Sequence, residues 1–168
     1  MDTIIRNWQL DDAKALAGML NNKKIQDNLR DGLPFPYTEK DALDFIHEML
    51  AADPTKTFAF AIVNGENEAI GSIGVFRCEN IHRQTAEMGY YLSENYWGQG
   101  IGTKAAKQLT DHIFAETDII RIFAEPFSTN RGSCRVLEKC GFQFEGTLRK
   151  NAVKNGESKY MQMYALIK

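Results

Sequence analysis

The stretch Trp97-Gly98-Gln99-Gly100-Ile101-Gly102-Thr103 decides the fold of this sequence and is its first candidate for a ligand site. Its glycines stand at alternate positions, after a segment with strand periodicity and before a helical pattern. Glycine permits backbone conformations that turn successive N–H groups to one side, and a helix N-terminus adds its positive dipole end. Such a loop binds phosphate oxygens through backbone amides. A tight strand-to-helix turn without a ligand has the same spacing, so both interpretations stay open on this stretch alone.

The better-known nucleotide loops fit this stretch poorly. A Rossmann fingerprint needs glycine at its sixth place, where this loop has Thr103. The region about 20 residues further on, 119–121, is apolar and then basic, so it offers no acidic ribose partner. A Walker A loop needs four residues between its glycines and then Gly-Lys-Ser/Thr, which this loop lacks. What remains is a compact pyrophosphate cradle.

The sequence on either side of the loop predicts an α+β domain. Apolar residues at helical spacing predict four helices. They follow Asp11 and Asp12, Thr38 and Thr103, and the fourth runs over 130–140 and ends at Gly141. Strand patterns occur at 1–8, 57–63, 69–76, 85–92, 119–124, 142–148 and 159–167, with hairpin turns at Asn64-Gly65 and Asn155-Gly156. The order β-α-α-β-β-β-α-β-α-β-β predicts a meander followed by one βαβ crossover, hence one parallel pair in a mixed sheet. The length of 168 residues fits one domain over 1–168.

Composition excludes several classes of protein. Lys plus Arg is 20 and Asp plus Glu is 22, a formal net charge of −2, which argues against a nucleic-acid partner. No apolar run approaches the ~20 residues of a membrane span, and residues 1–6 do not resemble a signal peptide. We therefore predict a cytoplasmic protein without a membrane partner. Three cysteines (Cys78, Cys134, Cys140) without metal-ligand spacing predict no metal site and no disulfide framework.

Five blocks of the sequence resemble the GNAT superfamily of acyl-CoA-dependent N-acetyltransferases. They are the stretch at 97–103, Asn130-Arg131-Gly132-Ser133 with Leu-Glu-Lys-Cys-Gly-Phe at 137–142, Pro-Phe-Pro-Tyr-Thr at 34–38, Ala-Glu-Met-Gly-Tyr at 86–90, and Glu-Gly-Thr-Leu-Arg at 145–149. The last three are similar to the branch that contains the ribosomal-protein N-terminal acetyltransferases. The resemblance implies a mixed, mostly antiparallel sheet with a splayed parallel strand pair and about four helices.

The resemblance also implies which residues bind acetyl-CoA. Backbone amides would hold its pyrophosphate at Gly98, Gln99, Gly100, Ile101, Gly102 and Thr103. The strand that ends at Tyr91 and Leu92 would splay from the strand at 119–124, and the gap would take the pantetheine arm as an added strand. Asn130 would contact the pantetheine or the substrate region, although it is also a good helix N-cap. The family pattern usually begins with Gln or Arg, so Trp97 is a departure. Arg135 or Lys139 would meet the 3′-phosphate, but exposed helix charges seldom do so.

For the chemistry, an amine is mostly ammonium at pH 7, so transfer needs a group that accepts a proton. The resemblance implies Glu87 as that base, acting through a water; the alternative is an outward-facing strand residue. Many relatives place a tyrosine proton donor where this chain has Leu137, which cannot donate. The similar branch has serine at the place of Ser133, whose hydroxyl would bond the departing sulfur or, alternatively, only nearby backbone. A backbone N–H near Tyr91 or Leu92 would meet the oxyanion.

Together these features predict an N-acetyltransferase that moves an acetyl group directly from acetyl-CoA to a primary amine in a ternary complex. A protein N-terminal amine is favoured; a polyamine or aminoglycoside is the alternative acceptor. Tyr37, Phe35 and Trp8 are candidates for the acceptor side, against simple loop packing. A non-catalytic acyl-CoA-binding module, supported by Leu137, and a nucleotide-binding regulator are the rival classes. We expect a monomer or a homodimer.

Overall fold

Seven strands pair in the order β1-β2-β3-β4-β5-β7-β6 in the computed structural model, which describes residues 4–168. Every neighbouring pair is antiparallel except β4 and β5, which run parallel. The predicted α+β class with one parallel pair is confirmed. The strands are β1 (Ile5–Arg6), β2 (Thr57–Val63), β3 (Ala69–Arg77), β4 (Thr85–Leu92), β5 (Arg121–Ala124), β6 (Gln143–Lys154) and β7 (Glu157–Ile167).

Strand bounds differ from the expectation at the two ends of the chain. The strand predicted at 1–8 is reduced to β1, and residues 1–3 of that prediction lie outside the described residues. β6 is longer than predicted and continues to the turn at Asn155-Gly156, where both residues have positive φ. The predicted turn is confirmed.

Among residues 4–168 the structure has five α-helices, one more than the resemblance implies. They are α1 (Ala13–Leu20), α2 (Lys23–Gln26), α3 (Glu39–Ala51), α4 (Ile101–Glu116) and α5 (Arg131–Lys139), with short 3-10 turns η1 (Leu10–Asp12), η2 (Asn80–His82) and η3 (Glu94–Tyr96). The additional helix is α2, a single turn whose start is capped by Asn22, which accepts from the Lys24 N–H at 2.9 Å. So short a helix has no apolar periodicity to reveal it.

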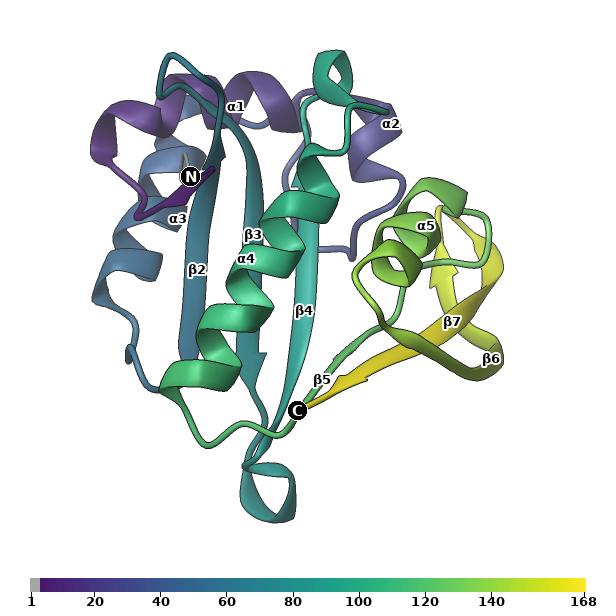
Figure 1. The fold of residues 1–168 in the computed structure, drawn as a ribbon. Coiled ribbons are helices and arrows are strands. Elements are labelled where there is room, and N and C mark those ends of the chain that lie inside the picture. The colour runs from purple at the N-terminus through teal and green to yellow at the C-terminus, as the bar shows by residue number, and fades with distance from the viewer. Residues whose placement is uncertain (1–3) are drawn as a thin grey trace.

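Helices cover both faces of the sheet (Figure 1). On one face, α4 and α5 bury Leu109, Ile113 and Leu137 against strand residues such as Ile62 and Ile73. On the other face, α1 and α3 pack Leu16, Leu20 and Ile46 against Ala61 and Val63. Because side chains alternate along a strand, β2 supplies Ile62 to the first core and its neighbours to the second.

β4 and β5 pair only at their beginning. The register joins Thr85, Ala86 and Glu87 to Arg121, Ile122 and Phe123, but β4 then runs on to Leu92. Pro126, which has no N–H to donate, follows β5 closely, and its carbonyl accepts from the Gln162 N–H of β7 at 2.8 Å. Figure 1 shows β5 and β7 leaning away from β4. The predicted splay is therefore present, and it begins after Glu87.

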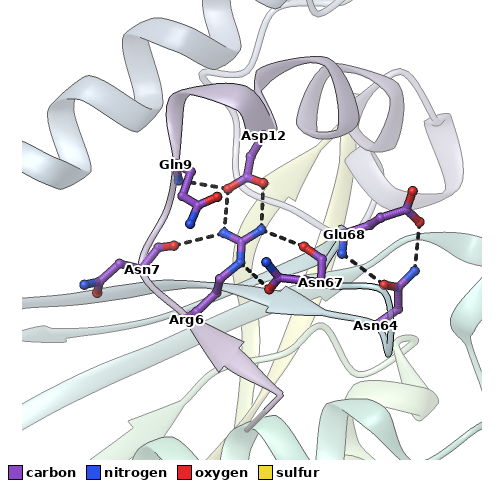
Figure 2. Close-up of polar contacts among 7 residues, drawn as sticks. All are labelled: Arg6, Asn7, Gln9, Asp12, Asn64, Asn67 and Glu68. Atoms are coloured by element: carbon purple, nitrogen blue, oxygen red, sulfur yellow. Dashed lines mark hydrogen bonds and ion pairs between the residues drawn. The ribbon is translucent and has the colours of Figure 1, made fainter.

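A polar cluster joins the N-terminal segment to the β2–β3 hairpin (Figure 2). Arg6 donates to both carboxylate oxygens of Asp12, at 2.8 and 2.9 Å, to the side chain and carbonyl of Asn67, both at 2.9 Å, and to the Asn7 carbonyl at 3.0 Å. All five guanidinium donors are thus used. Of the two aspartates that the sequence offers as caps for this helix, Asp12 is the N-cap residue of α1, but its carboxylate faces Arg6 and the Gln9 N–H and does not cap the helix with its side chain.

Candidate functional site

The glycine loop, residues 97–103, has the geometry of an open amide cradle. Gly98 and Gly100 have φ of +74° and +76°, and nothing lies within 4 Å of a Cβ built on either. Glycine is required there by the backbone conformation, not by a close neighbour. α4 begins at Ile101, and within residues 4–168 no acceptor takes a hydrogen bond from the amides of 98–103. These donors are free to bind an anion.

Trp97, the departure from the family pattern, closes the loop onto the preceding strand. Its indole Nε1–H donates to the Leu92 carbonyl at 2.9 Å. Gln99 turns its side chain back as well, donating to the Asn95 carbonyl at 3.1 Å. These two side chains therefore shape the loop from within, and the loop's binding capacity lies in its backbone.

A cavity of about 670 Å³, here called the loop cavity, opens in front of these amides. Of the predicted cofactor residues it is lined by Tyr91, Leu92, Gly98, Gly100, Ile101, Gly102, Thr103 and Asn130. Gln99 is not among the lining residues. Arg131, Arg135 and Lys139 also line it, and their four-residue spacing places them on one face of α5. Free amides beside this row of cations fit a diphosphate with a further phosphate.

The gap beyond Glu87 exposes backbone donors of β4. The Ser93 N–H donates to Ile70 of β3 at 2.8 Å, and the Cys78 N–H donates to Thr85 at 2.9 Å. In an antiparallel ladder alternate residues bond to the same neighbour. The N–H groups of Tyr90 and Leu92 consequently point toward the side that β5 has left, whereas that of Tyr91 points to β3.

A second cavity of about 460 Å³, the strand cavity, meets the loop cavity in this gap. Both are lined by Asn28, Leu29, Tyr90, Tyr91, Asn130 and Ser133. The strand cavity continues to Glu87 and Glu125, which also line a third cavity of about 450 Å³ next to it. Because side chains alternate along β4, Glu87 and Tyr90 lie on opposite faces of the opened sheet. A ligand in each cavity can therefore meet the other between these two residues.

Tyr90 lines both cavities and is a candidate site residue that the sequence reasoning missed. Its hydroxyl lies 2.8 Å from the Ser133 Oγ and donates to the Ser133 carbonyl at 2.9 Å. Burial raises the pKa of Tyr90, and the hydrogen bond with Ser133 offsets only part of that rise, so the phenol stays protonated at neutral pH. Ser133 is held at the start of α5 because the Asn130 side chain accepts from its N–H at 3.3 Å. The interpretation of Asn130 as an N-cap is confirmed, and Leu137 is fully buried.

On the other side of the gap, two carboxylates face one guanidinium. Arg30, in the segment after α2, forms an ion pair with Glu87 and lies 3.6 Å from a carboxylate oxygen of Glu125. Burial raises the pKa of Glu125, the negative charge of Glu87 adds to the rise, and Arg30 opposes it. Neither Arg30 nor Glu125 was predicted from the sequence, since no motif marks them.

Three aromatic residues were predicted for the acceptor side. Of these three, Tyr37 lines the strand cavity, and Trp8 and Phe35 do not. Trp8 instead packs edge-on against Phe45 with ring centroids 5.7 Å apart, and Phe35 is 54% exposed. The loop-packing interpretation therefore holds for Trp8. Burial and the carboxylates of Asp41 and Asp44 raise the pKa of Tyr37 to about 12.

Two further searches of the described residues had negative results. Within 4–168, no three His, Cys, Asp or Glu side chains are grouped so that they could hold a metal ion. No helix in the same part of the chain has the length and apolar content to cross a membrane.

A loop with free amides, an opened parallel strand pair and titratable side chains on both faces of the gap are features that an enzyme of group transfer would need. Comparison with known proteins identifies the family. The profile of the acetyltransferase (GNAT) domain matches residues 2–143. The chain belongs to the GNAT acetyltransferases, and the resemblance seen in the sequence is confirmed.

Individual relatives agree with this assignment. The probable N-acetyltransferase YjcK of Bacillus subtilis is 38% identical over 102 residues, 61% of this chain and 56% of that protein. The ribosomal-protein-serine acetyltransferase of Escherichia coli is 33% identical over 102 residues, with the same shares of 61% and 56%. The chain thus spans little more than half the length of these two curated relatives. The structure of RimL, a ribosomal L7/L12 alpha-N-protein acetyltransferase in complex with coenzyme A, shares the fold, with a TM-score of 0.86 and 24% identity over 99% of this chain and 95% of that one.

Proposed function

We propose that this chain transfers the acetyl group of acetyl-CoA directly to a primary amine, with a protein N-terminal amine as the favoured acceptor, and that residues 1–168 act as one catalytic unit. One observation carries the proposal: the loop cavity and the strand cavity meet at Tyr90 and Ser133, where β4 and β5 have separated. Donor and acceptor bound in the two cavities would meet there, as direct transfer in a ternary complex requires.

The donor side is assigned to the backbone first. The amides of Gly98, Gln99, Gly100, Ile101, Gly102 and Thr103 hold the pyrophosphate, supported by their lack of protein acceptors among residues 4–168. The N–H group of Leu92, rather than that of Tyr91, pairs with a pantetheine amide as an added strand would. Arg131, Arg135 and Lys139 supply the positive charge for the 3′-phosphate.

On the acceptor side, Glu87 is assigned as the general base. The acceptor arrives mostly as an ammonium ion, and the Glu87 carboxylate accepts one of its protons, directly or through a water, leaving a neutral amine. The lone pair of that amine then attacks the thioester carbonyl. The position of Glu87 at the last paired residue of β4, lining the strand cavity, supports this role.

The remaining chemistry falls to groups in the gap. The N–H of Tyr90, which points into the gap next to Tyr91, donates to the carbonyl oxygen as negative charge develops on it. When the carbon–sulfur bond breaks, Ser133 gives its hydroxyl proton to the sulfur, and the Tyr90 O–H turns from the Ser133 carbonyl to the Oγ and replaces that proton. The attacking nitrogen loses its second proton to water, and Tyr90 regains a proton from water, so that the protons balance. This order is supported by the contact of 2.8 Å between the two hydroxyl oxygens. Tyr90, which stays protonated at neutral pH, thus supplies the proton that Leu137 cannot donate.

The choice of acceptor is supported by the names of two relatives. The Escherichia coli protein acts on a ribosomal-protein serine, and RimL is described as an alpha-N-protein acetyltransferase. In this chain Glu87 and Glu125 offer negative charge to an ammonium group at the acceptor position. A small cationic amine would use the same two carboxylates, so the test must include one.

The test measures release of free thiol from acetyl-CoA with a panel of acceptors. The panel contains peptides that begin with serine or alanine, the same peptides already N-acetylated, and spermidine. We expect thiol release with the free-amine peptides and none with the blocked ones. Glu87→Gln should lower kcat about 100-fold and leave the KM for acetyl-CoA unchanged, whereas Glu66→Gln, in the exposed β2–β3 turn, should leave both unchanged.

Three outcomes would count against parts of the proposal. Activity with spermidine alone would make the protein a small-amine acetyltransferase. Stabilisation by acetyl-CoA without thiol release from any acceptor would favour a non-catalytic acyl-CoA-binding module. Stabilisation by ATP or NAD but not by coenzyme A would favour a nucleotide-binding regulator.

A further inference from the structure

We propose that Arg30 occupies the position of the acceptor's ammonium group, and that an incoming amine must displace its guanidinium from Glu87 before transfer. This inference rests on the proposed function, because it concerns the same carboxylate that is assigned there as the base. It makes Arg30 an internal competitor of the substrate.

The exposures of the three side chains indicate which of them gives way. The Arg30 side chain is 64% exposed, that of Glu87 28% and that of Glu125 19%. The cation thus lies on the solvent side and the two carboxylates lie inward, along the path that an acceptor follows to the gap. An ion pair with so exposed a partner contributes little to stability, because water screens it and a long side chain loses freedom. It can therefore open without disturbing the fold.

The segment that carries Arg30 is held in place on both sides of it. Asp31 accepts from the Lys154 ammonium at 2.9 Å, and the Lys154 side chain is only 10% exposed. Asp27 accepts from the Asn155 side chain at 3.0 Å. The β6–β7 turn therefore fixes the backbone, and displacement of Arg30 requires only a change of its side-chain rotamer.

The chemical difference between the two cations explains why one can stand in for the other without reacting. A guanidinium and a primary ammonium both carry one positive charge and donate N–H groups to a carboxylate. A primary ammonium can give a proton to Glu87 and become a nucleophile. The guanidinium of Arg30 keeps its protons at any physiological pH, so it neutralises Glu87 but is not acetylated.

The charged and titratable groups that face Glu87 come from several elements. They are Arg30 and Asp31 after α2, Cys78 after β3, Glu125 after β5 and Lys154 of β6. Lys154 is already paired with Asp31. Within residues 4–168, Arg30 is therefore the one cation in contact with Glu87 and Glu125, and its removal leaves these two carboxylates without a positive partner in the free enzyme.

The experiment compares Arg30→Gln with wild type in two ways. First, binding of an alanine-initiated peptide is measured by calorimetry in the presence of coenzyme A, so that no turnover occurs. We expect Arg30→Gln to bind the peptide with a free amine about two- to fivefold more tightly, the range set by an exposed ion pair. The N-acetylated peptide, which has no charge to exchange for Arg30, should not bind more tightly.

Second, the pH dependence of kcat/KM is measured with the free peptide. In Arg30→Gln the acid limb should move to higher pH, because Arg30 opposes the rise in the pKa of Glu125 and that opposition has been removed. Arg30→Lys keeps the charge and should bind both peptides like wild type in the calorimetric measurement, where coenzyme A offers no acetyl group to the new amine. Arg121→Gln is the matched control: it breaks a bidentate pair with Glu145, at 2.6 and 2.9 Å, outside the three cavities, and should change neither result.

The outcomes separate this inference from the proposed function. Tighter amine binding by Arg30→Gln without thiol release would support the competitor role and contradict the transferase. Thiol release with amine binding that is unchanged or weaker in Arg30→Gln would support the transferase and overturn the competitor role. Absence of amine binding in both proteins would also overturn it.

Discussion

The hydroxyl of Tyr90 contacts two atoms of a single residue, the Oγ and the carbonyl oxygen of Ser133. Forty-three positions separate the two residues in the chain. Serine alone is a poor proton donor, and a phenol is a stronger acid than an aliphatic alcohol, although burial weakens Tyr90 as an acid. The pair therefore resolves the difficulty that Leu137 raises for the proposed chemistry.

This arrangement predicts that Tyr90→Phe lowers kcat roughly tenfold, part of the range typical of general acid catalysis. The KM for acetyl-CoA should stay within about twofold of wild type, because the backbone that binds the cofactor is unchanged. Steady-state thiol release measures both constants. Tyr160→Phe, on the half-exposed part of β7, is the control and should have no effect.

Ser133→Ala combined with Tyr90→Phe completes the test. If the two hydroxyls act as one relay, the double variant should lose no more activity than the more damaging single one. Fully additive losses would mean that the two hydroxyls act independently.

At the scale of elements, the glycine loop joins β4 to α4 and does so with two residues in the left-handed region. Sequence reasoning predicted this element well because glycine spacing and helix starts are local signals. The bounds of β4 also match the prediction at both ends, because a strand pattern is read from neighbouring residues. By contrast, α2 and the extension of β6 depend on tertiary contacts, such as that between Lys154 and Asp31, which no local pattern reveals.

We predict that Gly100→Ala weakens the binding of coenzyme A about tenfold. An alanine at φ of +76° is strained by about 1–3 kcal/mol, and relief of that strain turns the amides of the cradle. Calorimetric titration with coenzyme A measures the affinity.

Gly65→Ala is the matched control, since Gly65 has open space around it and no positive φ. It should bind coenzyme A like wild type. Equal affinity for wild type and Gly100→Ala would mean that the loop does not bind through this conformation.

At the scale of the whole molecule, the Arg6 cluster ties the N-terminal segment to a hairpin some sixty residues away (Figure 2). Burial alone would raise the pKa of Asp12, but the hydrogen bonds from Arg6 and the Gln9 N–H outweigh it and hold that pKa below its usual value. A carboxyl with a depressed pKa in the folded protein stabilises the fold above its unfolded pKa. That stabilisation is lost as the pH falls through the folded value.

Asp12→Asn should therefore lower the free energy of unfolding at pH 7 by about 2 kcal/mol, since it leaves the largely buried guanidinium without its partner charge. The difference from wild type should shrink as the pH falls below about 4, the ordinary pKa of an aspartate, because protonation of Asp12 removes the charge that asparagine lacks. Urea unfolding at a series of pH values measures it. Asp111→Asn, which breaks an exposed pair with Lys107, should change stability little at any pH. A constant difference across the pH range would contradict the pairing.

The membership of the GNAT family follows from local features of the sequence. Three statements stay predictions from the sequence: that there is no nucleic-acid partner, that the protein is a monomer or a homodimer, and that it is cytoplasmic. The sequence by itself determined the α+β class, the order of the strands along the chain and the position of the glycine loop between β4 and α4. These depend on side-chain periodicity, glycine spacing and caps, which act over a few neighbouring residues.

The tertiary structure alone decided which residues meet in the gap. Tyr90 and Ser133 are 43 positions apart in the chain. Arg30 is 57 positions from Glu87 and 95 from Glu125. Their contacts exist because Pro126 ends β5, because α5 packs on the opened sheet, and because the β6–β7 turn holds the segment with Arg30. Long-range packing brings such groups together, and no short-range pattern records it.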